Sequence, residues 1–409
     1  MKLKKNDNVP EIRFDSFKEE WDKKRFKDFT KLSQGLQMAI SSRFLEDGEH
    51  RYFYITNEFL NPNSTKKYYI ESPSENVICT VDDILMTRTG NTGKVITNIS
   101  GAFHNNFFKV DYDKYETSKM FLYYLLTSND IQKEIIIRAG NSTIPDLNHS
   151  DFYSIKTSVP ALAEQSAIGS LFRTLDDLLA SYKDNLANYQ SLKVTMLSKM
   201  FPKAGQRVPE IRLDGFEGEW EVLQLSDICQ KVTEKNKDNN FNETFTNSAE
   251  FGIISQRDFF EKDISNEKSL NTYYVVRNND FVYNPRISNY APVGPVKRNK
   301  LGRTGVMSPL YFVFRITNSN IDLNFLETFF NTNTWHKFMK LNGDSGARAD
   351  RFAIKDSTFL TMPIAFPSLP EQQAIGAYFS NLDNLINSHQ EKISQLETLK
   401  KKLLQDMFI

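Results

Sequence analysis

The chain has 409 residues, and its 51 lysines and arginines balance 51 aspartates and glutamates. Hydrophobic residues make up 40% of it and aromatic residues 13%, which excludes a disordered chain and predicts packed cores. No apolar run approaches the roughly 20 residues of a membrane-spanning helix, so we expect a cytoplasmic protein without membrane contact. Because the net charge is zero, a nucleic-acid function has to rest on local basic patches.

An internal repeat organises the chain. Residues 9–21 recur as residues 208–220, with nine of the thirteen positions identical. A second pair, residues 160–169 and 367–376, shares the pattern Pro-x-Leu-x-Glu-Gln-x-Ala-Ile-Gly. Self-similarity at a fixed spacing is the signature of one structural unit used more than once. We therefore predict two copies of one fold, each made of a domain followed by a long helix.

Between the repeated motifs, each half contains short apolar runs separated by turns rich in Gly, Asn, Pro and Ser. In both halves a strand-like run, residues 83–87 and 280–284, leads into a polar loop that holds an arginine. An aromatic, helix-like run follows downstream in each half. This mixture predicts an α+β fold. The predicted organisation is listed in chain order: first domain, 1–158; first helix, 159–203; second domain, 204–364; second helix, 365–409.

The two helical segments carry apolar residues at heptad spacing. Such a pattern gives each helix a seam to bury, and the two seams predict an antiparallel coiled coil. A histidine at one seam position is typical of a polar residue that sets the register. The predicted seam residues are Ile168, Leu171, Leu175, Leu178 and Tyr182 in the first helix, and Ile375, Tyr378, Leu382, Leu385 and His389 in the second.

The sequence contains no recognisable catalytic constellation. The five histidines have no metal-ligand spacing, and Cys79 and Cys229 have no CxxC partner, so we expect no metal site and interpret the cysteines as core residues. Residues 90–94 resemble a phosphate-binding loop, but Arg88 and Val95 stand where a Walker A motif needs Gly and Ser or Thr. No nucleotide-binding or adenine-methylase motif follows a predicted strand. We therefore expect no cofactor on this chain and no catalysis by it.

Two loop regions at matching places are free of acidic residues. One is the 27-residue stretch between Asp83 and Asp111, and the other is the 41-residue stretch between Asp280 and Asp322. Both contain basic residues among Asn, Thr, Ser and Gly, so they can place Arg and Asn on base edges, and Ser, Thr and backbone N–H groups on phosphates. A third polar loop recurs at residues 140–145 and 343–351. The residues that we predict to contact DNA are Arg88, Thr89, Asn91, Thr92, Lys94, Asn141, Ser142 and Thr143 in the first domain, and Arg286, Ser288, Asn289, Lys297, Arg298, Arg348 and Arg351 in the second.

Taken together, the repeated openings, the arginine loops, residues 142–148 and the repeated helix starts resemble the specificity subunit of type I restriction-modification systems. The resemblance covers essentially the whole chain. It implies two target-recognition domains that each read one half of a bipartite, asymmetric site in double-stranded DNA, with the helices setting the gap. It also implies two modification subunits, which carry S-adenosylmethionine and methylate adenine, and motor-nuclease subunits that use ATP and Mg²⁺ to cleave.

Two other function classes compete with this interpretation. A structural adaptor, in which two modules on a coiled coil bind protein or glycan partners, suits the neutral charge. A self-sufficient nuclease or methylase is opposed by the missing motifs. Binding that weakens steeply with salt would favour the DNA reader over the adaptor.

Overall fold

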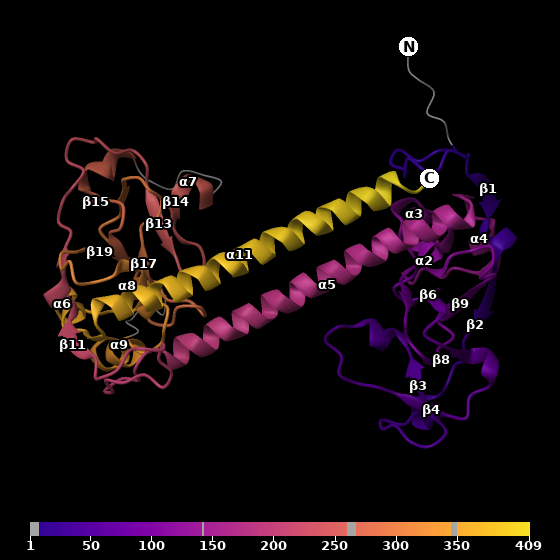
Figure 1. Ribbon diagram of the computed structural model, residues 1–409, viewed down its shortest axis with the longest axis horizontal. Coiled ribbons are helices and arrows are strands. Elements are labelled where there is room, and N and C mark those ends of the chain that lie inside the picture. Colours follow the sequence, from indigo (N-terminus) through magenta and orange to yellow (C-terminus); the bar gives the residue numbers. More distant parts are fainter. Residues whose placement is uncertain (1–7, 141–142, 260–266, 345–349) are drawn as a thin grey trace, which may run out of the picture. The chain divides into compact units, whose positions relative to one another are not determined.

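The structure, a computed structural model, describes residues 8–140, 143–259, 267–344 and 350–409 (Figure 1). The chain divides into two compact units, Met1–Lys183 with Glu391–Ile409, and Asp184–Gln390. Each unit holds one α+β domain and part of each of two long helices, α5 (Leu162–Lys199) and α11 (Leu369–Asp406). The predicted fold class and both predicted helices are thus confirmed. The two units are defined by spatial contacts, whereas the predicted boundaries separate each domain from its helix. The predicted domain boundaries therefore remain a prediction.

The described part of the first unit contains a β-rich domain with four short α-helices, three of which follow its two four-stranded sheets. Its strands order as β2-β9-β6-β7, β4-β3-β8-β5 and β1-β10. In chain order the elements are β1 (Asp22–Arg25), α1 (Phe26–Phe29), β2 (Thr30–Gln34), β3 (Arg51–Ile55), β4 (Tyr69–Glu71), β5 (Ile78–Cys79), β6 (Ile84–Thr87), β7 (Val95–Thr97), β8 (Gly101–Phe103), β9 (Phe107–Tyr112), α2 (Lys119–Thr127), α3 (Asn129–Ala139), α4 (His149–Ser154) and β10 (Lys156–Val159), with single 3₁₀ turns at Ile40–Ser42, Asn57–Leu60 and Glu75–Val77.

The second unit has a similar order of elements, but its strands form one four-stranded sheet and several two-stranded ones. Its strands order as β12-β19-β16-β17, β13-β14, β15-β18 and β11-β20. In chain order the elements are β11 (Glu221–Gln224), α6 (Leu225–Ile228), β12 (Cys229–Lys231), β13 (Phe245–Ser248), β14 (Gly252–Ser255), α7 (Gln256–Phe259), a 3₁₀ turn (Glu267–Thr272), β15 (Tyr274–Val276), β16 (Phe281–Tyr283), β17 (Val296–Arg298), β18 (Gly305–Met307), β19 (Phe312–Ile316), α8 (Leu323–Phe330), α9 (His336–Asn342), α10 (Asp356–Leu360) and β20 (Pro363–Phe366).

The two four-stranded sheets β2-β9-β6-β7 and β12-β19-β16-β17 are equivalent. In each, the strand that precedes the arginine loop, β6 or β16, is buried along its whole length and pairs antiparallel with both neighbours. The predicted strands at these positions are therefore confirmed. Cys79 and Cys229 are both buried and free, as expected of core cysteines. Burial raises the pKa of Cys79 to about 11 and that of Cys229 to about 12.

The loop after each of these strands is closed by the same backbone contact. The amide of Thr87 donates to the carbonyl of Lys94 at 2.9 Å, and the amide of Asn284 donates to that of Pro295 at 2.9 Å. The second loop needs glycine at 294, where φ is +83° and a Cβ would approach the Asn284 carbonyl oxygen to 2.2 Å. Each loop is consequently anchored to its sheet and presents its middle residues outward.

The repeated motifs build the junction between each domain and its own helix. Arg13 donates from Nε and Nη2 to the Glu164 carboxylate at 2.6 and 2.7 Å, and Arg212 does the same to Glu371 at 2.7 Å for both bonds. Both glutamates are almost fully buried. A buried carboxylate is tolerated when a bidentate guanidinium neutralises it. The repeated Ile-Arg and Glu-Gln pairs are therefore structural, since they tie the start of the domain to the start of α5 or α11.

The repeated Glu-Gln-x-x-x-Gly pattern also fixes the first helix after the sheet. Gln372 accepts the Asp322 amide at 3.0 Å and donates to the Asn320 and Pro367 carbonyls. Gly376 lies so close to the first turn of α8 that a Cβ would meet the Asp322 carboxylate oxygen at 2.7 Å. The equivalent residues of the first unit, Gln165 and Gly169, hold α2 in the same way.

Each unit is completed by the C-terminal end of the other repeat's helix. Phe408, just after α11, packs in the core of the first unit with its ring centroid 5.8 Å from that of Phe172. Phe201, just after α5, packs in the core of the second unit, 6.3 Å from Phe379. The domain of one unit and the helix end that closes its core thus come from different halves of the sequence.

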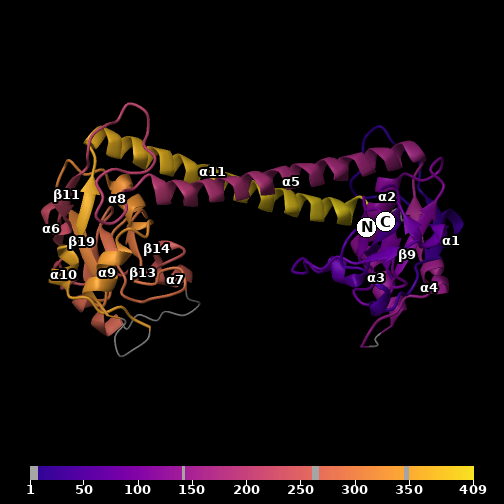
Figure 2. The same cartoon turned by 90° about the horizontal axis from the view of Figure 1, so that it is seen from below.

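Within each unit, parts of α5 and α11 lie side by side in both views (Figures 1 and 2). In the first unit Lys183 pairs with Glu397 at 2.7 Å and Lys400 pairs with Asp176. In the second, the Tyr189 and His389 rings meet edge to face at 5.2 Å. Residues closer to the end of α5 contact residues closer to the start of α11. The two helices therefore pair antiparallel, as predicted.

The buried stripe of the helices differs from the predicted seam. Ile168, Leu175, Ile375 and Leu382 are buried as expected, and Leu171, Tyr182 and Tyr378 pack partly buried against the cores. By contrast, Leu178 and Leu385 are 40% and 43% exposed, so their assignment to the seam was wrong. The core contact instead falls on neighbouring positions, which are Phe172, Leu179 and Phe379. The start of each helix packs on a domain as well as on the end of the other helix, which shifts the apolar face by one position.

Candidate nucleic-acid interface

In both domains the arginine loop is joined to the third polar loop by an isolated antiparallel bridge. Thr89 bridges to Asp146 in the first domain, and Arg286 bridges to Arg351 in the second. The neighbouring hydrogen bonds match as well. The Leu147 amide donates to the Arg88 carbonyl at 2.9 Å, and the Phe352 amide donates to the Pro285 carbonyl at 2.7 Å. The bridge therefore marks equivalent sites with different side chains.

In the first domain the arginine at this site is already neutralised. The Arg88 guanidinium donates twice to the Asp146 carboxylate, at 2.6 and 2.8 Å, and lies over the Phe108 ring at 5.6 Å from its centroid. Its side chain is only 20% exposed. Arg88 therefore orders the loop, and a DNA contact by its guanidinium would have to compete with Asp146.

The other predicted residues of the first loop divide into internal and exposed groups. Thr92 donates to the Pro145 carbonyl at 2.7 Å and so holds the two loops together. Asn91, at φ +70°, and Lys94 are exposed, as is Thr143 on the third loop. The predictions for Asn141 and Ser142 lie outside the described residues. Asn91, Lys94 and Thr143 are thus the side chains of this site that point to solvent.

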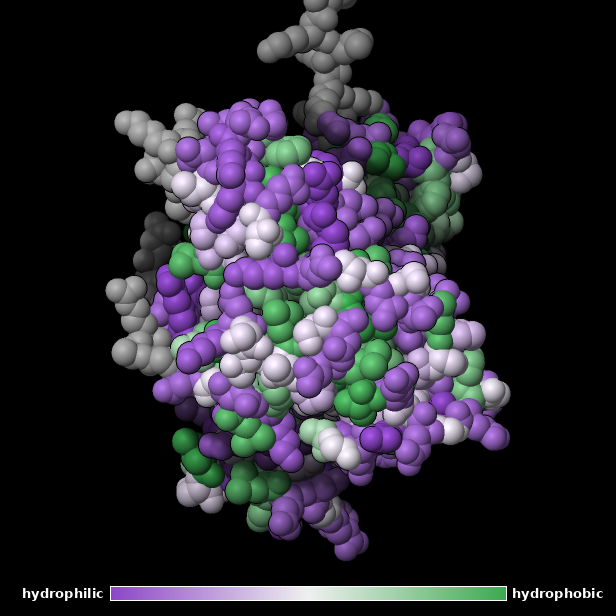
Figure 3. All heavy atoms as spheres, turned by 90° about the vertical axis from the view of Figure 1, so that its left-hand side faces the viewer, coloured by the Kyte–Doolittle hydropathy of each residue, from purple (hydrophilic) through white to green (hydrophobic). Residues whose placement is uncertain are grey.

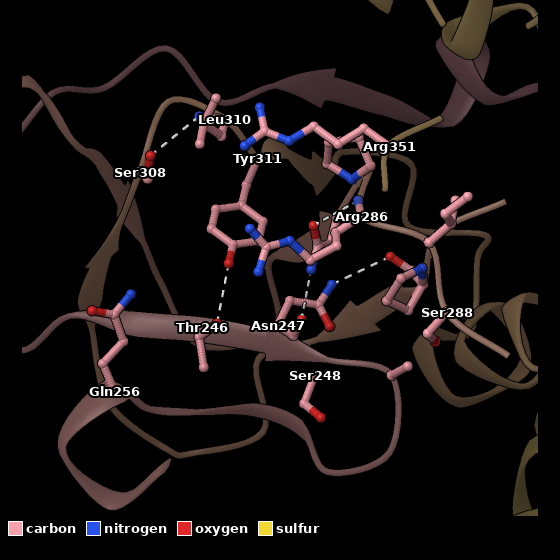
Figure 4. A pocket seen from close by; sticks show the side chains of 15 residues that line it. Thr246, Asn247, Ser248, Gln256, Arg286, Ser288, Ser308, Leu310, Tyr311 and Arg351 are labelled. Carbon is pink, nitrogen blue, oxygen red and sulfur yellow. Dashed lines mark hydrogen bonds between the residues drawn. The ribbon is translucent and has the colours of Figure 1, made fainter. Parts of the chain in front are cut away.

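The second domain has a pocket of about 480 Å³ at the equivalent place (Figure 4). Arg286 and Arg351 line one side of it, and their side chains extend toward Tyr311. The Tyr311 hydroxyl is hydrogen-bonded to Thr246 at 3.1 Å, which fixes the ring. Arg286 is exposed and has no ion-pair partner among the described residues. For Arg351, the carboxylate of the adjacent Asp350 lies 3.9 Å away.

The floor of the pocket carries two amide side chains. Asn247 is 2% exposed, and its Nδ2 donates to the Val282 carbonyl at 2.7 Å. Its Oδ1 accepts no hydrogen bond, nor does the Oε1 of Gln256, and both oxygens are buried. Buried acceptors without a donor are uncommon and call for an explanation. The pocket therefore has guanidinium donors on one side, and two acceptors that no protein donor satisfies are buried in its floor.

The turn beside the pocket presents two further predicted residues. Ser288 and Ala291 exchange two backbone hydrogen bonds at 3.1 Å, so the chain reverses tightly between them. Ser288 and Asn289 are exposed, and Tyr290 between them and Ala291 is 81% exposed. Arg348, the remaining prediction on the third loop, lies outside the described residues.

The structure contradicts the prediction for Arg298. Its side chain is buried and pairs with Glu327 of α8 at 2.8 Å, since β17 packs beside that helix. Lys297 donates to Asn331 at 2.9 Å and lines a separate hollow with Lys193 and Asp383 of the long helices. Burial lowers the pKa of Lys297. These two side chains lie outside the pocket that Arg286 lines.

Several positive charges of the acid-free stretch are neutralised in the fold by acidic residues from outside the stretch. Arg303 pairs with Glu243 at 2.7 Å, and Arg315 pairs with Asp280 at 2.6 Å. The acids come from outside the stretch, which a sequence window does not reveal. The pocket residues Thr246, Asn247, Gln256 and Tyr311 were missed, because uncharged side chains give no signal when charges are counted along the sequence.

The described residues show neither a metal centre nor a membrane segment. Nowhere in this part of the chain do three His, Cys, Asp or Glu side chains gather so that they could hold a metal ion. None of the helices in it has both the length and the apolar character needed to cross a bilayer. The face of the second unit that Figure 3 shows is mainly hydrophilic, with apolar side chains in small separate groups.

Comparisons with known proteins agree with this arrangement. The family model for the type I restriction modification DNA specificity domain matches residues 18–188 and 217–398. The type I restriction enzyme MjaVIII specificity subunit of Methanocaldococcus jannaschii is 23% identical over 99% of this chain and 96% of its own. The putative MjaX specificity subunit of the same organism is 24% identical over 71% of this chain and 68% of its own. In fold, the crystal structure of the S subunit from M. genitalium matches with a TM-score of 0.59 at 14% identity, covering 98% of this chain and 99% of that one.

Two copies of one α+β domain, each with an anchored polar loop and a long helix, define a duplicated recognition protein. The chain belongs to the family of type I restriction modification DNA specificity domains. Its role is that of a specificity subunit, which recognises DNA sequence and is not itself catalytic, as the sequence predicted. The adaptor alternative is not favoured.

Proposed function

We propose that each domain of this chain binds one half of a bipartite, asymmetric site in double-stranded DNA. The observation that supports this most directly is the bridge that recurs in both domains with different side chains, Thr89 and Asp146 in one and Arg286 and Arg351 in the other. One backbone frame with two sets of side chains presents two different patterns of donors and acceptors. Since base pairs are distinguished by such patterns, the two domains recognise different sequences.

The exposed residues of the loops are the contacts in this proposal. Asn91, Lys94 and Thr143 serve the first domain, with Thr89 at its bridge. Arg286, Ser288, Asn289 and Arg351 serve the second. Asn and Arg suit adenine and guanine edges, and Lys, Ser and Thr suit phosphates. Arg88 and Thr92 act by holding the first loop in shape, because their polar groups are engaged within the protein.

The reactions belong to partner subunits in this proposal. Two modification subunits bring S-adenosylmethionine and methylate adenine, and motor-nuclease subunits bring ATP and Mg²⁺ and cleave DNA, all in the cytoplasm. The modification subunit has to extrude its target adenine from the duplex. This chain's task is then to hold the duplex on both sides of that base.

Selection from a DNA library tests the proposal. The chain, purified in complex with its modification subunits, is incubated with duplexes of random sequence at several salt concentrations, and the bound fraction is sequenced. We expect enrichment of one motif with two specified parts and an unspecified gap, and affinity that falls steeply with salt. Binding without any enriched motif, or binding that salt leaves unchanged, would contradict the proposal.

A further inference from the structure

The arginine pair of the second domain allows the chemistry of one half-site to be stated more closely. Arg286 and Arg351 lie directly opposite each other across their bridge. Like charges in this position are unfavourable, because residues opposite each other on antiparallel chains have Cβ atoms only about 5 Å apart. No ion-pair partner relieves Arg286 among the described residues. An acceptor-bearing ligand placed between the two guanidinium groups would relieve the repulsion.

The pocket positions both side chains for one ligand. They extend to the same side, toward Tyr311, whose ring is fixed by its hydrogen bond to Thr246 (Figure 4). The backbone beneath them is also fixed, since the Arg286 amide donates to the Asn284 side chain at 3.0 Å and the Phe352 amide donates to the Pro285 carbonyl. A pair of guanidinium groups on a rigid frame suits recognition of a defined edge better than loose attraction to a charged surface.

The chemistry of the pocket favours a base edge over a phosphate. A phosphate offers only acceptors, whereas the pocket is also lined by the hydroxyl groups of Thr246, Ser248 and Tyr311, which can accept as well as donate. A guanine–cytosine pair presents the O6 and N7 acceptors of guanine beside the N4 amino group of cytosine. Arginine contacting guanine O6 and N7 is the commonest specific contact in the major groove.

We propose that Arg286 and Arg351 together read guanine in the half-site that the second domain binds. The inference rests on the proposed function and adds to it the identity of the base. It is confined to one half-site, because the equivalent bridge of the first domain holds Thr89 and Asp146 and because Arg88 is paired with that aspartate. The first half-site is accordingly read without a free arginine at this place.

The test compares variants of the whole complex in the same library selection. The variants are Arg286→Gln and Arg351→Gln, and the matched control is Arg303→Gln, an arginine of the same domain that pairs with Glu243 outside the pocket. We expect the native complex to select guanine at one position or two adjacent positions of one half-site. Each pocket variant should reduce that preference roughly 10-fold or more. The other half-site should stay unchanged in every variant, and thermal unfolding curves that match those of the native complex show that the second domain of each variant is folded.

Two results overturn the inference in different ways. If the pocket variants weaken binding to all sequences equally and keep the preference for guanine, the arginines contact phosphate, and the proposed function stands while this inference fails. The inference also fails if the motif selected by the native complex contains no guanine, or if the substitutions change the preference for guanine in neither half. A native complex that selects no motif refutes the proposed function itself.

Discussion

The ring of Phe408 packs against that of Phe121 with their centroids 5.6 Å apart, which joins the end of α11 to the first turn of α2. The second unit has the equivalent contact between Phe201 and Phe325, at 5.3 Å. In each unit an aromatic residue that follows one helix closes the core of a domain from the other half of the sequence. The stability of either domain therefore depends on the helix of the other repeat.

Replacing either aromatic residue by alanine should destabilise the unit whose core it completes. We expect Phe408→Ala to lower the free energy of unfolding of the first unit by about 3–5 kcal/mol, because a buried phenyl ring is lost and a cavity remains. Phe201→Ala should do the same in the second unit. Denaturant unfolding measures both. The control is Leu399→Ala, whose side chain is 44% exposed. Equal, small effects in all three variants would contradict this account of the cores.

The buried pair of Arg212 and Glu371 makes a second prediction about stability. Replacing Glu371 by Ala leaves the Arg212 guanidinium, 16% exposed, without its carboxylate, and should cost about 3–5 kcal/mol in the free energy of unfolding. The matched control is Glu243→Ala, which breaks the more exposed pair with Arg303 and should cost less than about 1 kcal/mol. Similar losses in the two variants would show that the repeated Glu-Gln motif does not anchor the helix.

A side chain at position 376 should weaken the packing of α11 on α8. A Cβ at this position would lie 2.9 Å from the Asn324 Cβ and 3.0 Å from the Phe325 amide nitrogen. We expect Gly376→Ala to lower stability by about 1–3 kcal/mol, although alanine favours helices, because the close packing of α8 on α11 must open. The control is Gln373→Ala on the exposed side of the same helix. If Gly376→Ala stabilises the chain, the packing described for this junction is wrong.

The buried cysteines predict a loss of stability at high pH. Their pKa values, raised to about 11 for Cys79 and about 12 for Cys229, mean that the folded chain keeps both thiol protons while the unfolded chain loses them near pH 9. Stability is therefore complete below about pH 9 and falls as the pH rises toward 11, by on the order of 2 kcal/mol per thiol at about pH 10.5. Unfolding curves of the native chain and of Cys79→Ala with Cys229→Ala, at pH 8 and 10.5, measure the difference. A native chain that loses no more stability than the double variant would refute it.

Much of the fold follows from the sequence because its signals are local or repeated. The heptad spacing defined both helices, and the matched motifs defined two copies of one domain. The seam was displaced at Leu178 and Leu385 because a heptad pattern does not show that a helix also packs on a globular domain. The structural role of Arg13 and Glu164 was also hidden, since they lie far apart in sequence and meet only in the fold.

The candidate site was less accessible to sequence reasoning. Counting charges along the sequence predicted DNA contacts for both Arg298 and Arg286. In the fold, Arg298 is neutralised by Glu327, whereas Arg286 lies opposite Arg351. Both relationships join residues that are distant in sequence, so only the folded chain separates a structural arginine from an available one. The same holds for Tyr311 and Asn247, which become part of the pocket only when β13 and the β19 region come together.

The central claim is that each domain of this chain specifies one half of the DNA sequence that its partners methylate. Mapping adenine methylation across the genome of a host that expresses the chain with its modification subunits tests it most directly. The native chain is compared with a first-domain variant, Asn91→Ala with Lys94→Ala, and a second-domain variant, Arg286→Gln with Arg351→Gln. We predict a bipartite, asymmetric motif for the native chain, a change in one half alone for the first variant, and a change in the other half alone for the second. The same motif in all three strains, or methylation at no defined motif, would contradict the account.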